Sequence, residues 1–149
     1  MGVSTDAIIC YGISYEEGYE FPWGEEDIEE WWINDIKGFK PVMEVYDDSG
    51  EWLEGVTEEQ INEYFEYRRK FKNNHPLPIS LVHHCSNDYP MYILAVPSTV
   101  ITAFRGYPKT INPDHFDLSN HNIQPFIEFC KEFDLYVEDP DWYLCSYWG

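Results

Sequence analysis

The sequence has few basic residues, no closely spaced cysteine pair and no long apolar run. Nine Lys and Arg residues face 28 Asp and Glu residues, which gives a formal net charge of −19. A chain this acidic repels nucleic acid and anionic membranes, so we expect it to bind neither directly. No stretch approaches the ~18 apolar residues of a membrane span. The opening residues also lack the basic region and apolar run of a signal peptide, so we expect a cytoplasmic protein.

The spacing patterns of catalytic and metal sites are missing as well. Cys10, Cys85, Cys130 and Cys145 are far apart and each lies in an apolar stretch, which favours buried free thiols over disulfides. No GxSxG frame surrounds a serine, and the glycine-bearing turns lack phosphate-loop spacing. We therefore predict no catalytic residue, no metal and no cofactor.

Aromatic residues are abundant, with 12 Tyr, 9 Phe and 6 Trp in 149 residues. A disordered acidic tail would not carry so many rings, so the composition indicates a folded core built largely from aromatic side chains. A chain of this length can bury most of its unfolded surface in one unit. We predict a single acidic domain over residues 1–149.

Hydrophobic periodicity predicts strands and helices in an irregular order. Strands are predicted at residues 7–12, 41–46, 79–85, 91–96, 99–104 and 142–148, and helices at 25–36, 57–75 and 123–133. Thr57 and Gln60 fit a capping box, while Pro125 fits only a first turn capped by Asn122 or a residue just before it. Because the order does not repeat βα units, we predict an α+β domain with a mainly antiparallel sheet and about three helices packed on it.

Acidic residues are concentrated early in the sequence. Residues 1–66 hold 19 acidic residues against two lysines, a net charge of −17, and residues 67–149 carry only −2. A solvated acidic face would keep an aromatic-rich protein soluble, but solubility needs no such segregation. The segregation therefore favours docking of the acidic half on a basic partner.

The first predicted helix has unrelieved rows of glutamates. The i, i+4 pairs are Glu25 with Glu29, Glu26 with Glu30 and, in the next helix, Glu59 with Glu63. Like charges at this spacing repel, and the sequence places no Lys or Arg to relieve the first two pairs. Carboxylates about 6 Å apart on a rigid face can imitate a nucleic-acid backbone. Neutralising the four glutamates of the first helix is expected to leave the fold intact or slightly more stable.

Aromatic residues interleave with these acids and can anchor a protein interface, although most of them are expected in the core. The predicted partner-binding residues are Glu16, Glu17, Glu20, Trp23, Glu25, Glu26, Glu29, Glu30, Asp47, Asp48, Glu51, Glu59 and Glu63. The predicted partner is a basic nucleic-acid-binding protein.

A small enzyme is the alternative from another class. Its site would use His83, His84, His115 or His121 with a neighbouring acid. His83 and Cys85 lie on one face of a strand, so they could share a zinc site. Such a site would need two more ligands, for which His115 and His121 are the candidates. A virion accessory protein is a third possibility.

The opening residues Met1–Gly12, MGVSTDAIICYG, resemble the start of small uncharacterised proteins encoded by phages and some bacteria, in which this segment precedes an acidic, aromatic stretch. The resemblance implies a viral or prophage setting, where small acidic inhibitors of host defence are frequent. It carries no catalytic residue. With the charge pattern, it gives the leading hypothesis of a DNA-mimic or anti-defence inhibitor, such as an anti-CRISPR protein, acting in the host cytoplasm on a nuclease, polymerase or CRISPR effector.

Overall fold

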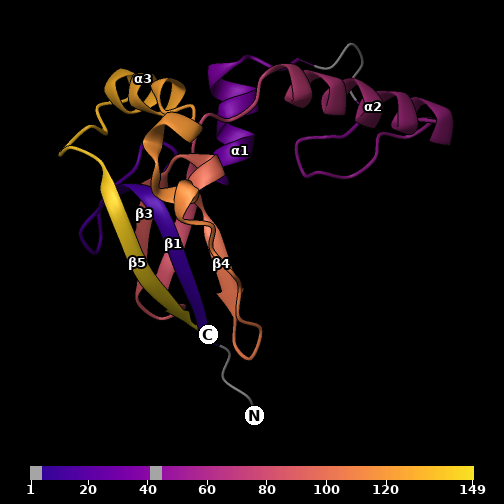
Figure 1. The fold of residues 1–149 in the computed structure, drawn as a ribbon. Coiled ribbons are helices and arrows are strands. Elements are labelled where there is room, and N and C mark those ends of the chain that lie inside the picture. Colours follow the sequence, from indigo (N-terminus) through magenta and orange to yellow (C-terminus); the bar gives the residue numbers. More distant parts are fainter. Residues whose placement is uncertain (1–4, 41–44) are drawn as a thin grey trace. The chain divides into compact units, whose positions relative to one another are not determined.

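A five-stranded sheet and three α-helices make up the regular structure of residues 5–40 and 45–149, which are the residues that the computed structural model describes (Figure 1). The strands are β1 (Thr5–Ser14), β2 (Ser80–Ser86), β3 (Pro90–Ala95), β4 (Ile101–Phe104) and β5 (Asp141–Trp148), and the helices are α1 (Ile28–Trp31), α2 (Glu58–Asn74) and α3 (Gln124–Glu132). The predicted α+β class with a mainly antiparallel sheet is confirmed.

The contacts within the chain divide it into two compact units. The sheet unit comprises Met1–Pro22 and Pro78–Gly149 and holds all five strands and α3, and the insert comprises Trp23–Leu77 and holds α1 and α2. The single domain expected from the length stays a prediction.

β1 has hydrogen-bonded partners along both of its edges. One edge pairs with β5 over Thr5–Gly12, and the other pairs first with β4 over Asp6–Ile9 and then with β3 over Gly12–Ser14. β3 also pairs with β2, and β2 pairs with β5 in the one parallel pairing of the described strands. The strands β1, β3, β2 and β5 therefore close into a ring.

Gly12 lies where the antiparallel pairing of β1 with β3 begins. A Cβ at this position would lie 1.9 Å from the Leu94 carbonyl oxygen and 2.7 Å from the Ala95 Cα. Only a residue without a side chain permits this approach. The predicted strand end at Gly12 is wrong, because the glycine lets β1 continue to Ser14.

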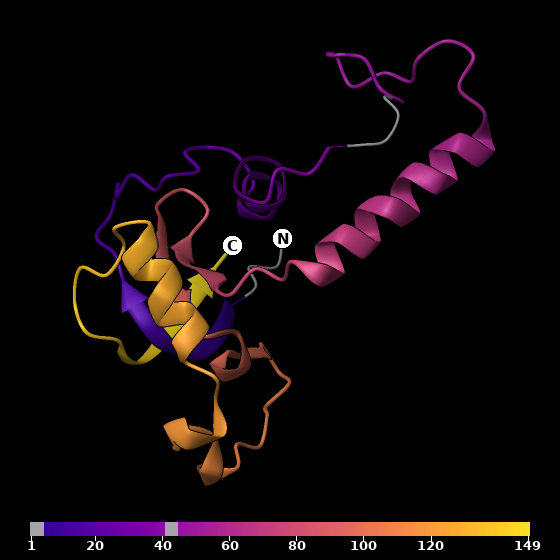
Figure 2. The same ribbon diagram turned by 90° about the horizontal axis from the view of Figure 1, so that it is seen from above.

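The core of the sheet unit combines small apolar side chains from the strands with phenylalanines from α3, which lies across one end of the strands (Figure 2). The buried apolar strand residues are Ile8, Cys10, Ile13, Val82, Ile93, Leu94 and Ala95, and the buried α3 residues are Phe126, Phe129 and Cys130. The predicted place of Pro125 in the first turn is confirmed. The predicted cap is wrong, because Ile123 occupies the N-cap position and its side chain makes no capping hydrogen bond.

The insert begins its first helix later than predicted. Asp27 is the N-cap, and its Oδ1 accepts hydrogen bonds from the backbone N–H groups of Glu29 at 3.0 Å and Glu30 at 3.1 Å. After α1 the chain continues as a π-helical turn over Trp32–Ile36. Aspartate is among the strongest N-cap residues, and here its capping decides the start of the helix.

α2 begins as its sequence predicts. The Thr57 hydroxyl accepts from the Gln60 backbone N–H, and the Gln60 side chain accepts from the Thr57 backbone N–H. Phe39 packs against the α2 rings of Tyr64, Tyr67 and Phe71, with ring centroids 5.1–6.2 Å apart. These contacts form the aromatic core of the insert.

The segment before α2 contains a turn at Asp47. Asp47 Oδ1 accepts from the Ser49 backbone N–H at 2.9 Å and from the Glu51 backbone N–H at 3.0 Å. Tyr46 forms an isolated bridge with Trp52. Most of the strand predicted at 41–46 lies outside the described residues.

Candidate functional site

The charge of the protein is shared almost equally between its two units. The insert has fifteen acidic and six basic residues, a net charge of −9, and the sheet unit has thirteen acidic and three basic residues, a net charge of −10. The basic cluster after residue 66, formed by Arg68, Arg69, Lys70 and Lys72, belongs to the insert. The two halves of the sequence therefore do not correspond to two charge regions of the fold.

The glutamate rows predicted for the first helix do not form. Glu25 and Glu26 precede the Asp27 cap, so they lie outside α1 and make no i, i+4 helical pair with Glu29 or Glu30. Glu29 and Glu30 instead occupy the first turn of α1, where a negative charge is favourable. The repulsion inferred from the sequence is absent here.

Glu30 has basic partners on α2. Its carboxylate forms an ion pair with the Arg68 guanidinium, and its Oε1 lies 3.4 Å from the Lys72 Nζ. Partial burial on its own would raise the pKa of Glu30, but the hydrogen bond and charge of Arg68, assisted by Lys72, outweigh it and lower the pKa. The expectation that no base relieves these glutamates is wrong, because the basic residues come from the next helix.

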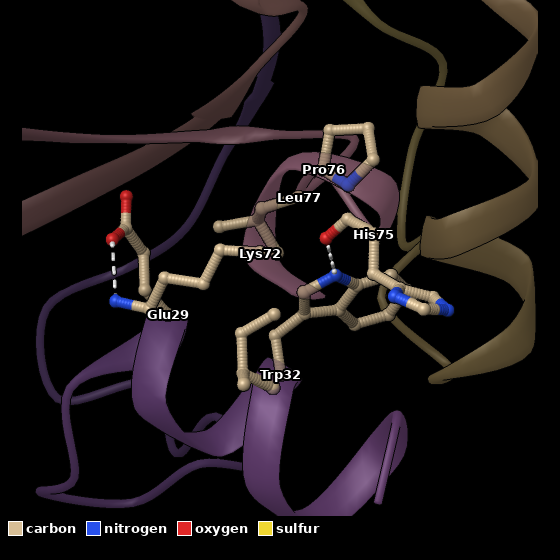
Figure 3. Close-up of a pocket in the computed structure, with 7 residues that line it drawn as sticks. Glu29, Trp32, Lys72, His75, Pro76 and Leu77 are labelled. Carbon is tan, nitrogen blue, oxygen red and sulfur yellow. Dashed lines mark hydrogen bonds and ion pairs between the residues drawn. The ribbon is translucent and has the colours of Figure 1, made fainter. Parts of the chain in front are cut away.

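A small pocket of about 150 Å³ lies at the same junction of α1 and α2 (Figure 3). Lys72 Nζ lies 4.0 Å from a Glu29 carboxylate oxygen, and Trp32 Nε1 donates a 3.0 Å hydrogen bond to the His75 carbonyl oxygen. These polar atoms face one another, as Figure 3 shows. The pocket is therefore best explained as part of the packing interface between the two helices of the insert.

Other predicted acids of the insert are exposed. Asp47, Asp48, Glu51, Glu59 and Glu63 form no ion pair with a described Lys or Arg. Hydrogen bonds from Ser49 and from the backbone of Glu51 lower the pKa of Asp47 and hold it ionised. These five residues, which we call the open acids, present negative charge from the turn at Asp47 and from the first part of α2.

The remaining predicted residues lie elsewhere. Trp23 is only 6% exposed and its ring packs 5.4 Å from that of Trp31, so it is a buried residue and not an exposed one. Glu16, Glu17 and Glu20 are exposed but lie in the sheet unit. The predicted set is therefore divided between two units.

The histidines of the enzyme alternative fall into two groups. His83 and His84 are neighbours on β2, and burial, followed by the charge of His83, lowers the pKa of His84. His115 and His121 converge, with ring centroids 5.0 Å apart. Among residues 5–40 and 45–149, no group of three potential metal ligands comes together, so the described part of the chain offers no metal site.

Ser98 lies beside the second histidine pair, and no motif in the sequence indicates this contact. His121 Nε2 lies 2.7 Å from the His115 carbonyl oxygen, which can only accept, so Nε2 carries the proton. His121 Nδ1 is then free to accept from the Ser98 hydroxyl at 2.7 Å. A serine hydroxyl, a histidine base and an orienting oxygen are the elements of an activated nucleophile.

The cysteines are all free, as the sequence indicates. Cys10 and Cys130 are buried, and burial raises the pKa of each thiol to about 12. Cys85 is exposed, so the prediction that every thiol is buried is wrong.

Within residues 5–40 and 45–149, no helix combines the length and the apolar character that crossing a bilayer requires. Comparison with known proteins finds no matching family model, no matching curated protein and no matching solved structure.

Proposed function

We propose that the protein is a small acidic binding module that docks on a basic, nucleic-acid-binding protein and blocks the surface that holds nucleic acid. The observation that carries this proposal is the set of open acids on the insert. Their carboxylates have no described ion-pair partner, although four basic side chains lie on the same helix α2. Unpaired exposed carboxylates on a helix can meet Lys and Arg of a partner and steer its approach.

The distribution of basic residues along α2 supports the same interpretation. Arg68 forms an ion pair with Glu30, and Lys72 lies within ion-pair distance of both Glu29 and Glu30. Lys70 pairs with Glu66 at 3.4 Å. The basic residues thus neutralise acids near the end of α2 and leave Glu59 and Glu63 near its start uncompensated. The proposal extends to a phage-encoded inhibitor in the host cytoplasm, and that part depends on the resemblance of Met1–Gly12.

Affinity capture from bacterial lysate tests the proposal. Full-length protein is immobilised at 50 mM NaCl and eluted in steps to 500 mM, and the eluates are identified by mass spectrometry. We expect nucleic-acid-binding proteins to be enriched and to elute as salt rises, because screening weakens exposed charge pairs. Capture that is indifferent to salt contradicts the proposal.

Two variants of equal net charge locate the surface. The first carries Glu51→Gln, Glu59→Gln and Glu63→Gln in the insert. The second carries Glu128→Gln, Glu132→Gln and Asp134→Asn in the sheet unit and serves as the control. We expect the first to lose the captured proteins and the second to keep them. Equal loss in both would indicate a nonspecific effect of net charge.

A second candidate function, hydrolysis of an ester or amide, is favoured by the Ser98–His121 pair. As the Ser98 oxygen attacks a carbonyl carbon, His121 Nδ1 would take the hydroxyl proton and give it to the leaving group. A solvent water, deprotonated by the same nitrogen, would then cleave the acyl–Ser98 ester, and the proton would return to the Ser98 oxygen. A fluorophosphonate probe tests it, because such probes label activated serines. Labelling should disappear in Ser98→Ala and fall in His121→Gln. The control is Ser119→Ala, because the hydroxyl of the native Ser119 donates to Asp117. Absence of labelling in the native protein rejects this function.

A further inference from the structure

A second hollow, of about 260 Å³, lies within the sheet unit and is lined mainly by aromatic and acidic residues. The lining residues come from the loop after β1, from the β2–β3 turn and from the start of β3. They include the rings Tyr15, Tyr19, Phe21 and Tyr92 and the acids Glu16, Glu17 and Asp88. None of the described residues that line it is basic. It shares no lining residue with the α1–α2 pocket and includes none of the open acids, nor Ser98 or His121.

The rings of the hollow are tilted against one another. Tyr15, Tyr19 and Phe21 form a trio with ring centroids 4.7–5.0 Å apart and interplanar angles of 46–72°. Phe21 also meets Tyr92 edge to face, at 5.9 Å and 88°. Rings tilted in this way present their faces and edges in several directions, rather than as one flat stack.

The backbone and Tyr15 hold this arrangement in place. Tyr15 is buried, its hydroxyl donates a 2.6 Å hydrogen bond to the Leu135 carbonyl oxygen, and its backbone N–H donates to the Tyr92 carbonyl oxygen at 3.1 Å. The Tyr19 backbone N–H donates to the Glu16 carbonyl oxygen, which closes the turn that carries both acids. The hollow is therefore formed before any ligand arrives.

We propose that this hollow binds the ammonium end of a lysine side chain of the basic partner. The proposal rests on the proposed function, and it names the side chain that the protein recognises. The faces of aromatic rings attract cations, and the carboxylates of Glu16, Glu17 and Asp88 supply complementary charge at the same place. Arginine prefers to lie flat on a ring, whereas the compact ammonium group suits rings that are tilted against one another.

Binding of small probes to the isolated full-length protein tests the site without any partner. N-acetyl-lysine methylamide is compared with N-acetyl-norleucine methylamide, which has a similar apolar chain and no charge, by titration followed in NMR spectra of the tyrosine rings. We expect saturable shifts at Tyr19 and Tyr92 with the lysine probe and a response about fivefold smaller with the norleucine probe. Equal responses overturn the proposal.

Variants assign the binding to the hollow. Tyr19→Leu keeps the apolar volume and removes the aromatic face, so it should weaken the lysine probe about fivefold. Tyr107→Leu is the matched control, because Tyr107 is exposed in the same unit and lies outside the hollow, and it should leave binding unchanged. Unchanged binding in Tyr19→Leu overturns the proposal. If that variant does not fold, the exposed double variant Glu16→Gln, Glu17→Gln replaces it, with weaker binding expected.

Choline, a free quaternary amine, is the third probe. Binding of choline without binding of the lysine probe would assign the hollow to a small free cation and overturn the assignment to a partner lysine. The proposed function and this site can fail separately. Lysine binding without capture of nucleic-acid-binding proteins rejects the function and keeps the site, whereas the reverse result rejects the site alone.

Discussion

Glu30 is the acidic residue whose environment differs most from what its sequence neighbours indicate. It is ionised against Arg68 and Lys72, and its lowered pKa means that folding favours its charged form. We predict that Glu30→Gln lowers the free energy of unfolding by about 1 kcal/mol at pH 7, since the pair is only partly shielded from solvent. Glu29→Gln is the control, and it should change stability by less than about 0.3 kcal/mol.

The pH dependence of this loss in the free energy of unfolding follows from the direction of the Glu30 pKa shift. The folded pKa of Glu30 lies below its ordinary value of 4.5, so the stabilisation is present above pH 4.5 and is lost as the pH falls through the lower folded pKa. Urea unfolding of the native protein and Glu30→Gln at pH 7 and at pH 3 measures it. A variant as stable as the native protein at pH 7 would instead support repulsion among the glutamates.

Cys85 differs from the buried thiols in its access to reagents. It is exposed on β2, whereas Cys10 and Cys130 are buried with a pKa of about 12. We predict that iodoacetamide modifies Cys85 first and reaches Cys10 and Cys130 only in denaturant, because the reactive species is the thiolate. Peptide mass spectrometry over a time course measures this order, with Cys85→Ser as the control. Equal rates for Cys10 and Cys85 would contradict the described packing.

At the scale of elements, the close pairing of β1 with β3 depends on Gly12. In Gly12→Ala the new methyl group would meet the backbone of Leu94 and Ala95, which cannot move aside without breaking strand pairing. We predict a loss of about 3 kcal/mol or more in the free energy of unfolding. Ser14→Ala, in the same strand, is the matched control. Thermal and urea unfolding measure both, and equal stabilities would show that β3 does not approach β1 so closely.

The elements that the sequence predicts well are those with local signals. The capping box of Thr57 and Gln60 marks the start of α2, and two apolar runs around a polar turn mark β2 and β3. The start of α1 was missed because three acids, Glu25, Glu26 and Asp27, precede it and periodicity does not say which of them caps. The continuation of β1 past Gly12 depends on a contact with β3, which no local pattern contains.

The candidate sites were less predictable because they depend on long-range contacts. Glu30 meets Arg68 from another helix, and Ser98 meets His121 from 23 residues away in the sequence. Composition predicts that the open acids are exposed. It does not predict the burial of Trp23, because a tryptophan flanked by acidic residues can be either buried or exposed.

At the scale of the whole molecule, both units carry a large excess of negative charge. Self-repulsion of like charges destabilises the compact state, and added salt screens it. We predict that raising NaCl from 20 to 200 mM raises Tm by a few degrees, measured by circular dichroism. The control variant Glu128→Gln, Glu132→Gln, Asp134→Asn should show a smaller rise. A fall in Tm would mean that ion pairs such as Glu30–Arg68 outweigh the repulsion.

The ring of strands also determines the order in which the protein can fold. Thr5 pairs with Trp148 and Gly12 with Asp141, so β1 leaves the ribosome long before its most extensive partner is synthesised. The contacts of the insert lie within Trp23–Leu77 and can form in the meantime. Pairing of β1 with β5 is therefore a late step of folding, and until Asp141–Trp148 is synthesised the emerging chain leaves the β5-facing edge of β1 without its partner.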